Sequence, residues 1–208
     1  MNGKSHQKTS VDIGTDVITA MDREFHQEPD RVLAIVGAAY LDSVLESLFR
    51  AISAGSPADM DKLLEPNGAL SSNGARIQLA CSLGLITQNQ RDELKLIAKI
   101  RNRFAHDFKV TGFVDPSIEG LCATLKGPIE FAAMPGKLFG AQVAEQMAEF
   151  MARSSATARE RFRTSVILLF GALLRRVHYV RTGDHQWFSF DPDDQRGPKV
   201  GTGPEAGS

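Results

Sequence analysis

The sequence has little cysteine, and it lacks the short motifs by which several enzyme classes are recognised. Its two cysteines, Cys81 and Cys122, stand alone among apolar or small residues, without the spacing of a structural zinc site or a redox pair. Both are expected to be buried free thiols. A Gly-rich phosphate loop, a GxSxG turn and an HExxH element are also missing. These absences argue against nucleotide hydrolase, esterase and metalloprotease functions, and they predict no cofactor and no metal.

The chain also lacks an excess of charge of one sign. Its 24 Lys and Arg residues nearly balance its 25 Asp and Glu residues, for a formal net charge of −1. The whole molecule therefore has no field that would gather DNA or an anionic membrane, and contact with nucleic acid requires a local basic patch. No stretch approaches the roughly 20 apolar residues that span a bilayer. Residues 1–9 are polar, without the apolar region of a signal peptide, so a cytoplasmic protein with no membrane partner is predicted.

What is present is an ordinary globular composition, with 42% hydrophobic and 24% charged residues in a chain of 208. That length suits one domain with one well-buried core. Residues 1–9 are expected to be a flexible N-terminus. Residues 188–208 are rich in Gly, Pro and Asp, which is the composition of a disordered tail. The folded domain is therefore predicted over residues 10–187.

Apolar residues recur at three- and four-residue steps, which predicts an all-α fold, a single-domain helical bundle. The clearest series follows Pro29-Asp30, two residues that suit the first turn of a helix, and consists of Val32, Leu33, Val36, Tyr40, Val44, Leu48 and Ile52. Breaks and caps such as Gly55 and Thr87 set the other boundaries. The predicted helices cover about 10–26, Pro29 to Ile52, 58–64, 72–84, the segment after Thr87 to His106, 116–125 and 138–180.

The last predicted helical region, with Ser154-Ser155 as a break, contains the apolar run 166–170. This run lacks period-two alternation, so it is predicted to be a buried helix rather than a strand. His178 and His185 have no carboxylate or thiol at ligand spacing, and packing or solvent contact is expected instead of metal binding. The arginines of the region are expected to form a solvated face: Arg159, Arg161, Arg163, Arg175, Arg176 and Arg181.

The segment Arg101-Asn102-Arg103-Phe104-Ala105-His106 closes the predicted helix that follows Thr87. A histidine can exchange a proton at cellular pH, and an arginine stays charged and can bind phosphate oxygens in a fork. Together they suffice in principle for metal-free RNA cleavage, with His106 as general base or acid and Arg101 neutralising the transition state.

Further cations surround this segment, and Asp107 is the one acid nearby: the cations are Lys95, Lys99, Arg103 and Lys109. They are candidates for binding nucleic acid or a partner. The alternative is that they are the ordinary basic residues of a helix C-terminal half, where positive charge complements the helix dipole.

Arg101 and His106 are five residues apart, so on a helix they point about 140° from each other, whereas Asn102 and His106 share a face. On a single helix, the Arg101 and His106 side chains would not both reach one small ligand. A two-fold pair of helices would bring two arginines and two histidines into one cleft. Chemistry at this segment is therefore predicted to belong to a homodimer.

The segment 101–106 resembles the motif of the HEPN superfamily, in which an arginine and a polar residue are followed by a histidine. This resemblance implies an all-helical domain and a dimeric, metal-independent ribonuclease of the toxin or phage-defence type. Asp42 and Glu46 on the preceding core helix resemble the acidic position of that superfamily. The resemblance thus implies a role for Asp42 in orienting Arg101 or His106, and it implies catalytic roles for Arg101, Asn102 and His106.

A wider resemblance, from about Arg31 to Val177, is to the mannitol operon repressor (MltR) family of bacterial regulators. The segments whose order and spacing carry it are 41–49, 76–86, 93–107 and 163–168. The family shares the Arg101 and His106 positions, so the two resemblances are compatible with one fold. The MltR resemblance implies an all-helical regulator that lowers expression of a sugar-alcohol uptake operon through protein partners.

Two functions therefore stay open. One is a regulator that binds a protein partner as a homodimer, and the other is an endoribonuclease with a composite dimer site whose substrate is RNA. The sequence contains no helix-turn-helix with a basic recognition helix, and its charge is near neutral. Direct sequence-specific DNA binding is therefore not expected.

Overall fold

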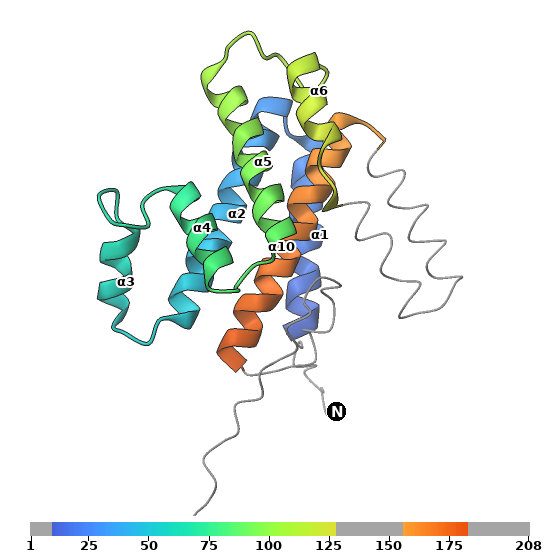
Figure 1. Ribbon diagram of the computed structural model, residues 1–208. Helices are drawn as coiled ribbons and strands as arrows, with labels where there is room; N and C mark the ends of the chain where they lie inside the picture. Colours follow the sequence, from blue (N-terminus) through green and yellow to red (C-terminus); the bar gives the residue numbers. More distant parts are fainter. Residues whose placement is uncertain (1–9, 128–155, 183–208) are drawn as a thin grey trace, which may run out of the picture.

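The computed structural model describes residues 10–127 and 156–182, with side chains from residue 17 onward (Figure 1). These residues form seven helices and no strand, which confirms the prediction of an all-α fold. The helices are α1 (Ser10–Gln27), α2 (Asp30–Ile52), α3 (Pro57–Leu64), α4 (Asn73–Ser82), α5 (Gln88–His106), α6 (Pro116–Ala123) and α10 (Ala158–Thr182). The predicted N-terminal segment 1–9, the region 138–155 and the tail 188–208 lie outside the described residues.

Local caps explain where these helices begin and end. The Thr87 hydroxyl accepts a hydrogen bond from the Gln90 amide, and the Gln90 side chain accepts one from the Thr87 amide, which is a capping box at the start of α5. Ser72 caps α4 in the same way as an N-cap acceptor. Gly84 follows α4 with φ of 70°, a left-handed conformation that glycine adopts without a steric penalty. The predicted cap at Thr87 is thus confirmed.

α2 is the central helix of the bundle and packs against α3, α4, α5 and α10 (Figure 1). Its buried side includes Leu33, Leu45 and Leu48, none of which is measurably exposed. α10 packs directly against α2 at Gly37, where a Cβ atom would lie in ordinary van der Waals contact with the Val166 side chain, at 3.4 Å. Val166 itself is buried within α10, so the apolar run 166–170 is helical as predicted.

α2 is also long and apolar enough to cross a membrane by length and composition alone. The prediction that no stretch approaches that size was therefore wrong. Half of its most apolar window is buried inside the domain, with Leu41 and Phe49 at 2% and 1% exposure. Packing against the neighbouring helices accounts for the apolar composition of α2, as expected for the core helix of a helical bundle.

Several helix ends are tied together by arginine side chains that come from distant parts of the chain. Carbonyl groups in the last turn of a helix have no partner within the helix, and a guanidinium can satisfy them. We call these side chains the arginine caps. At the end of α1, Arg159 donates to the Phe25 and Glu28 carbonyls, and in the loop after α4 the Leu85 carbonyl accepts from Arg176. Arg31 donates to the Phe104 carbonyl at the end of α5 and to the Val110 carbonyl in the loop that follows, and Arg161 donates to the Ala123 carbonyl at the end of α6.

The arginine caps correct the prediction of a solvated face for Arg159, Arg161 and Arg176, which donate to carbonyls of other segments. Arg175 and Arg181 are exposed, as predicted. Arg163 is only 6% exposed and forms ion pairs with Asp22 at 2.8 Å and with a glutamate on its own helix. Periodicity alone could not distinguish these side chains from solvated ones, because their partners are carbonyls and carboxylates of other segments.

The two thiols have different environments. Cys122 is fully buried, as predicted, and burial raises the pKa of its thiol to about 12. Cys81 is only partly buried, so the prediction of a buried thiol was wrong for this residue. Neither cysteine is in a disulfide.

Phe104 and Phe108 provide a test of the core. Phe104 is fully buried and its ring centroid lies 4.9 Å from that of Phe113, so Phe104→Ala should lower the free energy of unfolding by about 3–5 kcal/mol. Phe108 is 90% exposed, and Phe108→Ala is the matched control, with an expected change within about 0.5 kcal/mol. Urea denaturation followed by circular dichroism measures both. Similar losses in the two variants would contradict this packing.

Candidate functional site

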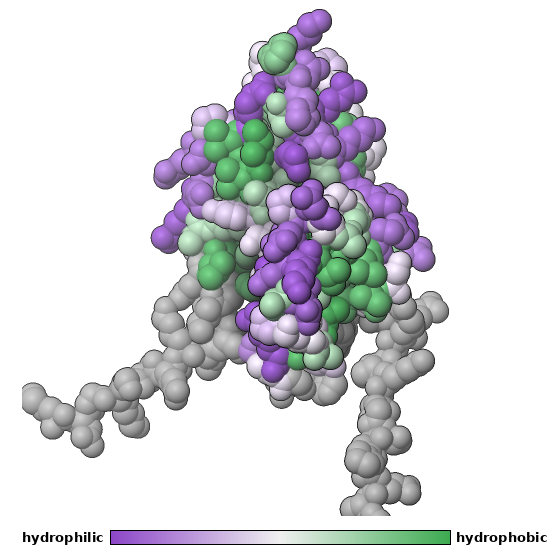
Figure 2. Space-filling model, turned by 90° about the vertical axis from the view of Figure 1, so that its left-hand side faces the viewer, coloured by the Kyte–Doolittle hydropathy of each residue, from purple (hydrophilic) through white to green (hydrophobic). Residues whose placement is uncertain are grey.

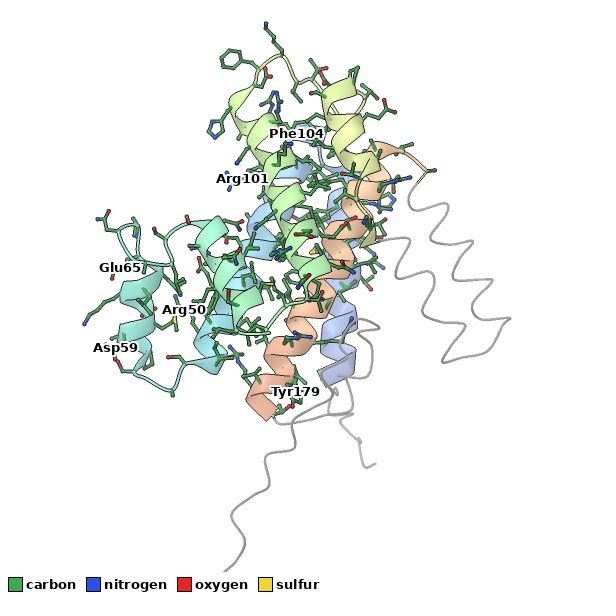
Figure 3. All side chains as sticks on the ribbon, viewed as in Figure 1. Arg50, Asp59, Glu65, Arg101, Phe104 and Tyr179 are labelled. Atoms are coloured by element: carbon green, nitrogen blue, oxygen red, sulfur yellow. The ribbon has the colours of Figure 1, made fainter. Side chains whose placement is uncertain are left out.

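A groove with a volume of about 840 Å³ lies between the N-terminal part of α4 and the second half of α5. Figure 3 shows Arg101 on the side of α5 that faces away from α6, and Phe104 on the side toward α6. The groove is lined by Asn73, Gly74 and Ile77 of α4, by Lys95, Ala98, Lys99, Arg101, Asn102, Arg103 and His106 of α5, and by Asp107. We call it the α4–α5 groove.

The α4–α5 groove is cationic although the protein as a whole is not. Four permanently charged cations line it, together with His106, and Asp107 is the one carboxylate among the lining residues. Lys95, Lys99 and Arg103 follow one another at four-residue steps, so they form a stripe along one face of α5. Like charges at this spacing destabilise a helix by a few tenths of a kcal/mol per pair. Helix stability therefore does not explain the stripe.

Arg101 is the most distinctive of these side chains. Among the residues that the structure describes, it is the one arginine that is partly buried and has no hydrogen bond or ion pair. A guanidinium carries five N–H donors in a fixed fork, and partial burial without an acceptor is unfavourable. Arg101 is thus placed to receive a carboxylate or phosphate group in the groove.

The other residues of the predicted motif lie in the same groove. Asn102 and His106 are exposed and make no hydrogen bond with any part of the chain that is described. One chain therefore brings Arg101 and His106 to the same groove, although they point in different directions from α5. The expectation that chemistry at this segment belongs to a homodimer stays a prediction, because lining one wide groove does not bring both side chains onto one small ligand.

The predicted accessory cations divide into two groups. Lys99 is exposed and lines the groove, and so does Arg103, whose guanidinium lies 4.0 Å from the Asp107 carboxylate. Lys109 is exposed but is not one of the lining residues. Its backbone amide donates to the Asp107 carboxylate at 3.0 Å. Lys109 thus lies beside the groove rather than in it.

Asp42 has partners other than the predicted ones. Its carboxylate accepts hydrogen bonds from the Arg76 guanidinium at 2.6 and 2.9 Å and from the Asn73 side chain at 2.9 Å. The predicted contact with Arg101 or His106 is not among the hydrogen bonds of the described residues. Since Asn73 lines the groove, Asp42 affects the shape of the groove indirectly, by holding the start of α4 in place.

Arg76 is the centre of this network, and it was not identified from the sequence. It is 5% exposed, and besides Asp42 it donates to the Leu70 and Ser71 carbonyls at 2.6 and 3.1 Å. The carboxylate of Glu46 lies 3.6 Å away. A buried guanidinium needs such partners. The network therefore ties α2, α4 and the loop before α4 together on one side of the groove.

Arg31 holds the other side of the groove. It donates to the Phe104 carbonyl, and to the carbonyls of Asp107 and Val110 at 3.3 and 2.8 Å. These carbonyls belong to the last turn of α5 and the loop after it, next to His106. No short-range pattern could have revealed this contact, because Arg31 and Phe104 are 73 positions apart.

Among the described residues, no group of three His, Cys, Asp or Glu side chains could hold a metal ion.

No protein-family model matches the sequence, and no curated protein matches it. The fold is similar to a chain in the X-ray structure of the MtlR–HPr complex from Escherichia coli, with a TM-score of 0.52 over 79% of this chain and 97% of that chain.

The chain has the fold of MtlR. The resemblance to the mannitol operon repressor family is thus confirmed at the level of the fold. The sequence identity is 17%, so the similarity establishes the arrangement of helices and does not transfer roles to single residues.

Asp42→Ala tests the role assigned to this carboxylate. The substitution leaves the buried Arg76 guanidinium without its main anionic partner, so it should lower the free energy of unfolding by about 3 kcal/mol. Ser43→Ala is the matched control, because Ser43 is the next residue of α2 and is exposed. Thermal and urea denaturation measure the difference. A change below about 0.5 kcal/mol for Asp42→Ala would show that the ion pair contributes nothing to stability.

Proposed function

We propose that this chain is a regulatory protein of the mannitol-repressor type, which lowers expression of a sugar-alcohol uptake operon by binding a protein partner. The observation that carries the proposal is the similarity in fold to MtlR across 97% of that chain, in a structure that contains HPr. HPr, or a protein like it, is therefore the first candidate partner. We further propose that the regulator acts as a homodimer.

The surface of the molecule is consistent with a protein partner. Phe108 and Val114 are 90% and 84% exposed, and they lie in the segment that follows α5. Aromatic residues and arginines are enriched at protein interfaces, where they supply most of the binding energy. Phe108 directly follows the groove residues His106 and Asp107. An exposed aromatic side chain that follows the groove residues along the chain suits a binding surface.

The proposal predicts a direct complex with HPr. Isothermal titration of the full chain with purified HPr from the same organism should show saturable binding, with a Kd on the order of 1 μM as for a transient regulatory contact. A second soluble protein of similar size and net charge serves as the control. Absence of saturable heat at about 100 μM HPr would contradict the HPr assignment. Sedimentation velocity of the same samples reports whether the chain is a dimer.

A second candidate function is a metal-independent endoribonuclease. The observation that favours it is that Arg101, Asn102 and His106 line one cationic groove. His106 would remove the proton of the 2′-hydroxyl as the 2′-oxygen attacks the phosphorus, and Arg101 would stabilise the negative charge of the transition state. The bond between the phosphorus and the 5′-oxygen would break in the same step, and the departing 5′-oxygen would take a proton from water. A homodimer would supply a second set of these groups, if the two grooves face each other.

The ribonuclease hypothesis predicts cleavage in the presence of EDTA. A labelled single-stranded RNA incubated with the full chain should give fragments ending in a 2′,3′-cyclic phosphate, and both Arg101→Ala and His106→Ala should reduce the rate at least about 100-fold. Lys109→Ala is the matched control, because Lys109 lies outside the groove. Fragments produced equally by both variants would show a contaminating nuclease. RNA that remains intact with the wild-type chain leaves the regulatory function as the better one.

A further inference from the structure

We propose that the α4–α5 groove is the docking surface for an acidic segment of the protein partner, and that Arg101 is the residue that binds its carboxylate or phosphate group. This inference rests on the proposed regulatory function and specifies the chemistry of the partner. It assigns a binding role to Arg101 and adds Lys95 and the first turn of α4 to the surface.

The hydrogen bonds and ion pairs of the arginines in this chain support a binding role for Arg101. Seven other described arginines that are at least partly buried donate to a carbonyl or form an ion pair. Arg101 is partly buried and has neither, and Arg175, which also has neither, is exposed at the surface. Lys99 has no partner among the described residues, and Lys95 has only a 3.4 Å contact with the Gln78 side chain. The groove therefore offers three cations whose charges are not neutralised by a carboxylate of the described residues.

The first turn of α4 adds to this positive surface. Asn73 and Gly74 line the groove at the helix N-terminus, where the partial charge of the helix dipole is positive. A Cβ atom at Gly74 would have no neighbour within 4 Å, so the space in front of this turn is open. An acidic segment would thus meet cations from α5 on one side and the positive end of the α4 helix dipole on the other.

The dimensions and the uncharged lining suit a peptide segment. The part of α5 that lines the groove, from Lys95 to His106, is about 16 Å long at 1.5 Å per residue, which matches roughly three turns of a partner helix. Gly74, Ile77 and Ala98 supply apolar atoms between the cations. Phe108 lies beyond the end of the stripe and is almost fully exposed. Figure 2 shows this side of the molecule, where hydrophilic and apolar areas alternate. An amphipathic acidic segment would use both.

Single-stranded RNA fits the same surface less well. Proteins that bind single strands without sequence preference stack bases on aromatic side chains, and no aromatic residue is among the residues that line the groove. The protein also has a net charge of −1, so a long polyanion would gain little beyond the groove itself. The observations therefore favour an acidic protein segment, and RNA is an outcome to be tested.

The experiment uses the full chain and two labelled probes, an acidic amphipathic peptide of about 12 residues and an RNA oligonucleotide of similar extended length. Fluorescence anisotropy measures both at low and at physiological salt. We expect the peptide to bind, with an affinity that falls as salt increases, because exposed charges are screened. Arg101→Glu should weaken peptide binding at least about tenfold, and Phe108→Ala should weaken it severalfold.

Arg23→Glu is the matched control, since Arg23 is exposed on α1 outside the groove and undergoes the same change of charge. Circular dichroism verifies that each variant is folded, and Arg101→Gln replaces Arg101→Glu if the latter is not. Failure of the peptide to bind, equal weakening by Arg23→Glu, or tighter binding of the RNA would overturn the inference.

Titration of HPr with the same variants separates this inference from the proposed function. Loss of HPr binding in Arg101→Glu supports both. HPr binding that is unchanged in Arg101→Glu overturns the groove as docking surface and leaves the regulatory proposal standing. Peptide binding that depends on Arg101, in a chain that does not bind HPr, supports the groove and removes HPr as the partner.

Discussion

The fold depends on guanidinium groups that satisfy the free carbonyls at the ends of helices. A bundle of short helices has many unpaired carbonyl groups, and burying them without partners would be unfavourable. In this protein the arginine caps meet that requirement for α1, α5 and α6, and Arg176 satisfies the Leu85 carbonyl in the loop after α4. Because each cap comes from a distant segment, the same contacts that complete a helix also fix its position against another helix.

The α4–α5 groove is a consequence of this arrangement. Arg76 joins the start of α4 to Asp42 of α2, and Arg31 joins the end of α5 to the start of α2. α2 therefore acts as the common support for both walls of the groove. Within this frame Arg101 is conspicuous, because it is partly buried and lacks the acceptors that the other such arginines have. A ligand from outside the described chain would supply what the fold does not.

The fold and the groove support different parts of the proposed function. The similarity to MtlR concerns the arrangement of helices, and at 17% identity it leaves the chemistry of single residues open. The groove provides that chemistry, with cations concentrated on one face of a protein that is close to neutral. Regulation through a protein partner and RNA cleavage would both use these cations. They differ in what His106 does, since partner binding needs only its exposure and cleavage needs its proton.

The sequence by itself determined the helices of the described residues, because apolar periodicity and caps such as Thr87 are local properties of a helix. It also located the motif 101–106 at the end of α5. The tertiary structure alone decided the roles of Arg31, Arg76 and Asp42, whose partners lie about 30 to 80 positions away in the chain. It also showed that α4 completes the site. Periodicity specifies which face of a helix is apolar, but only packing specifies which carbonyl or carboxylate a given arginine reaches.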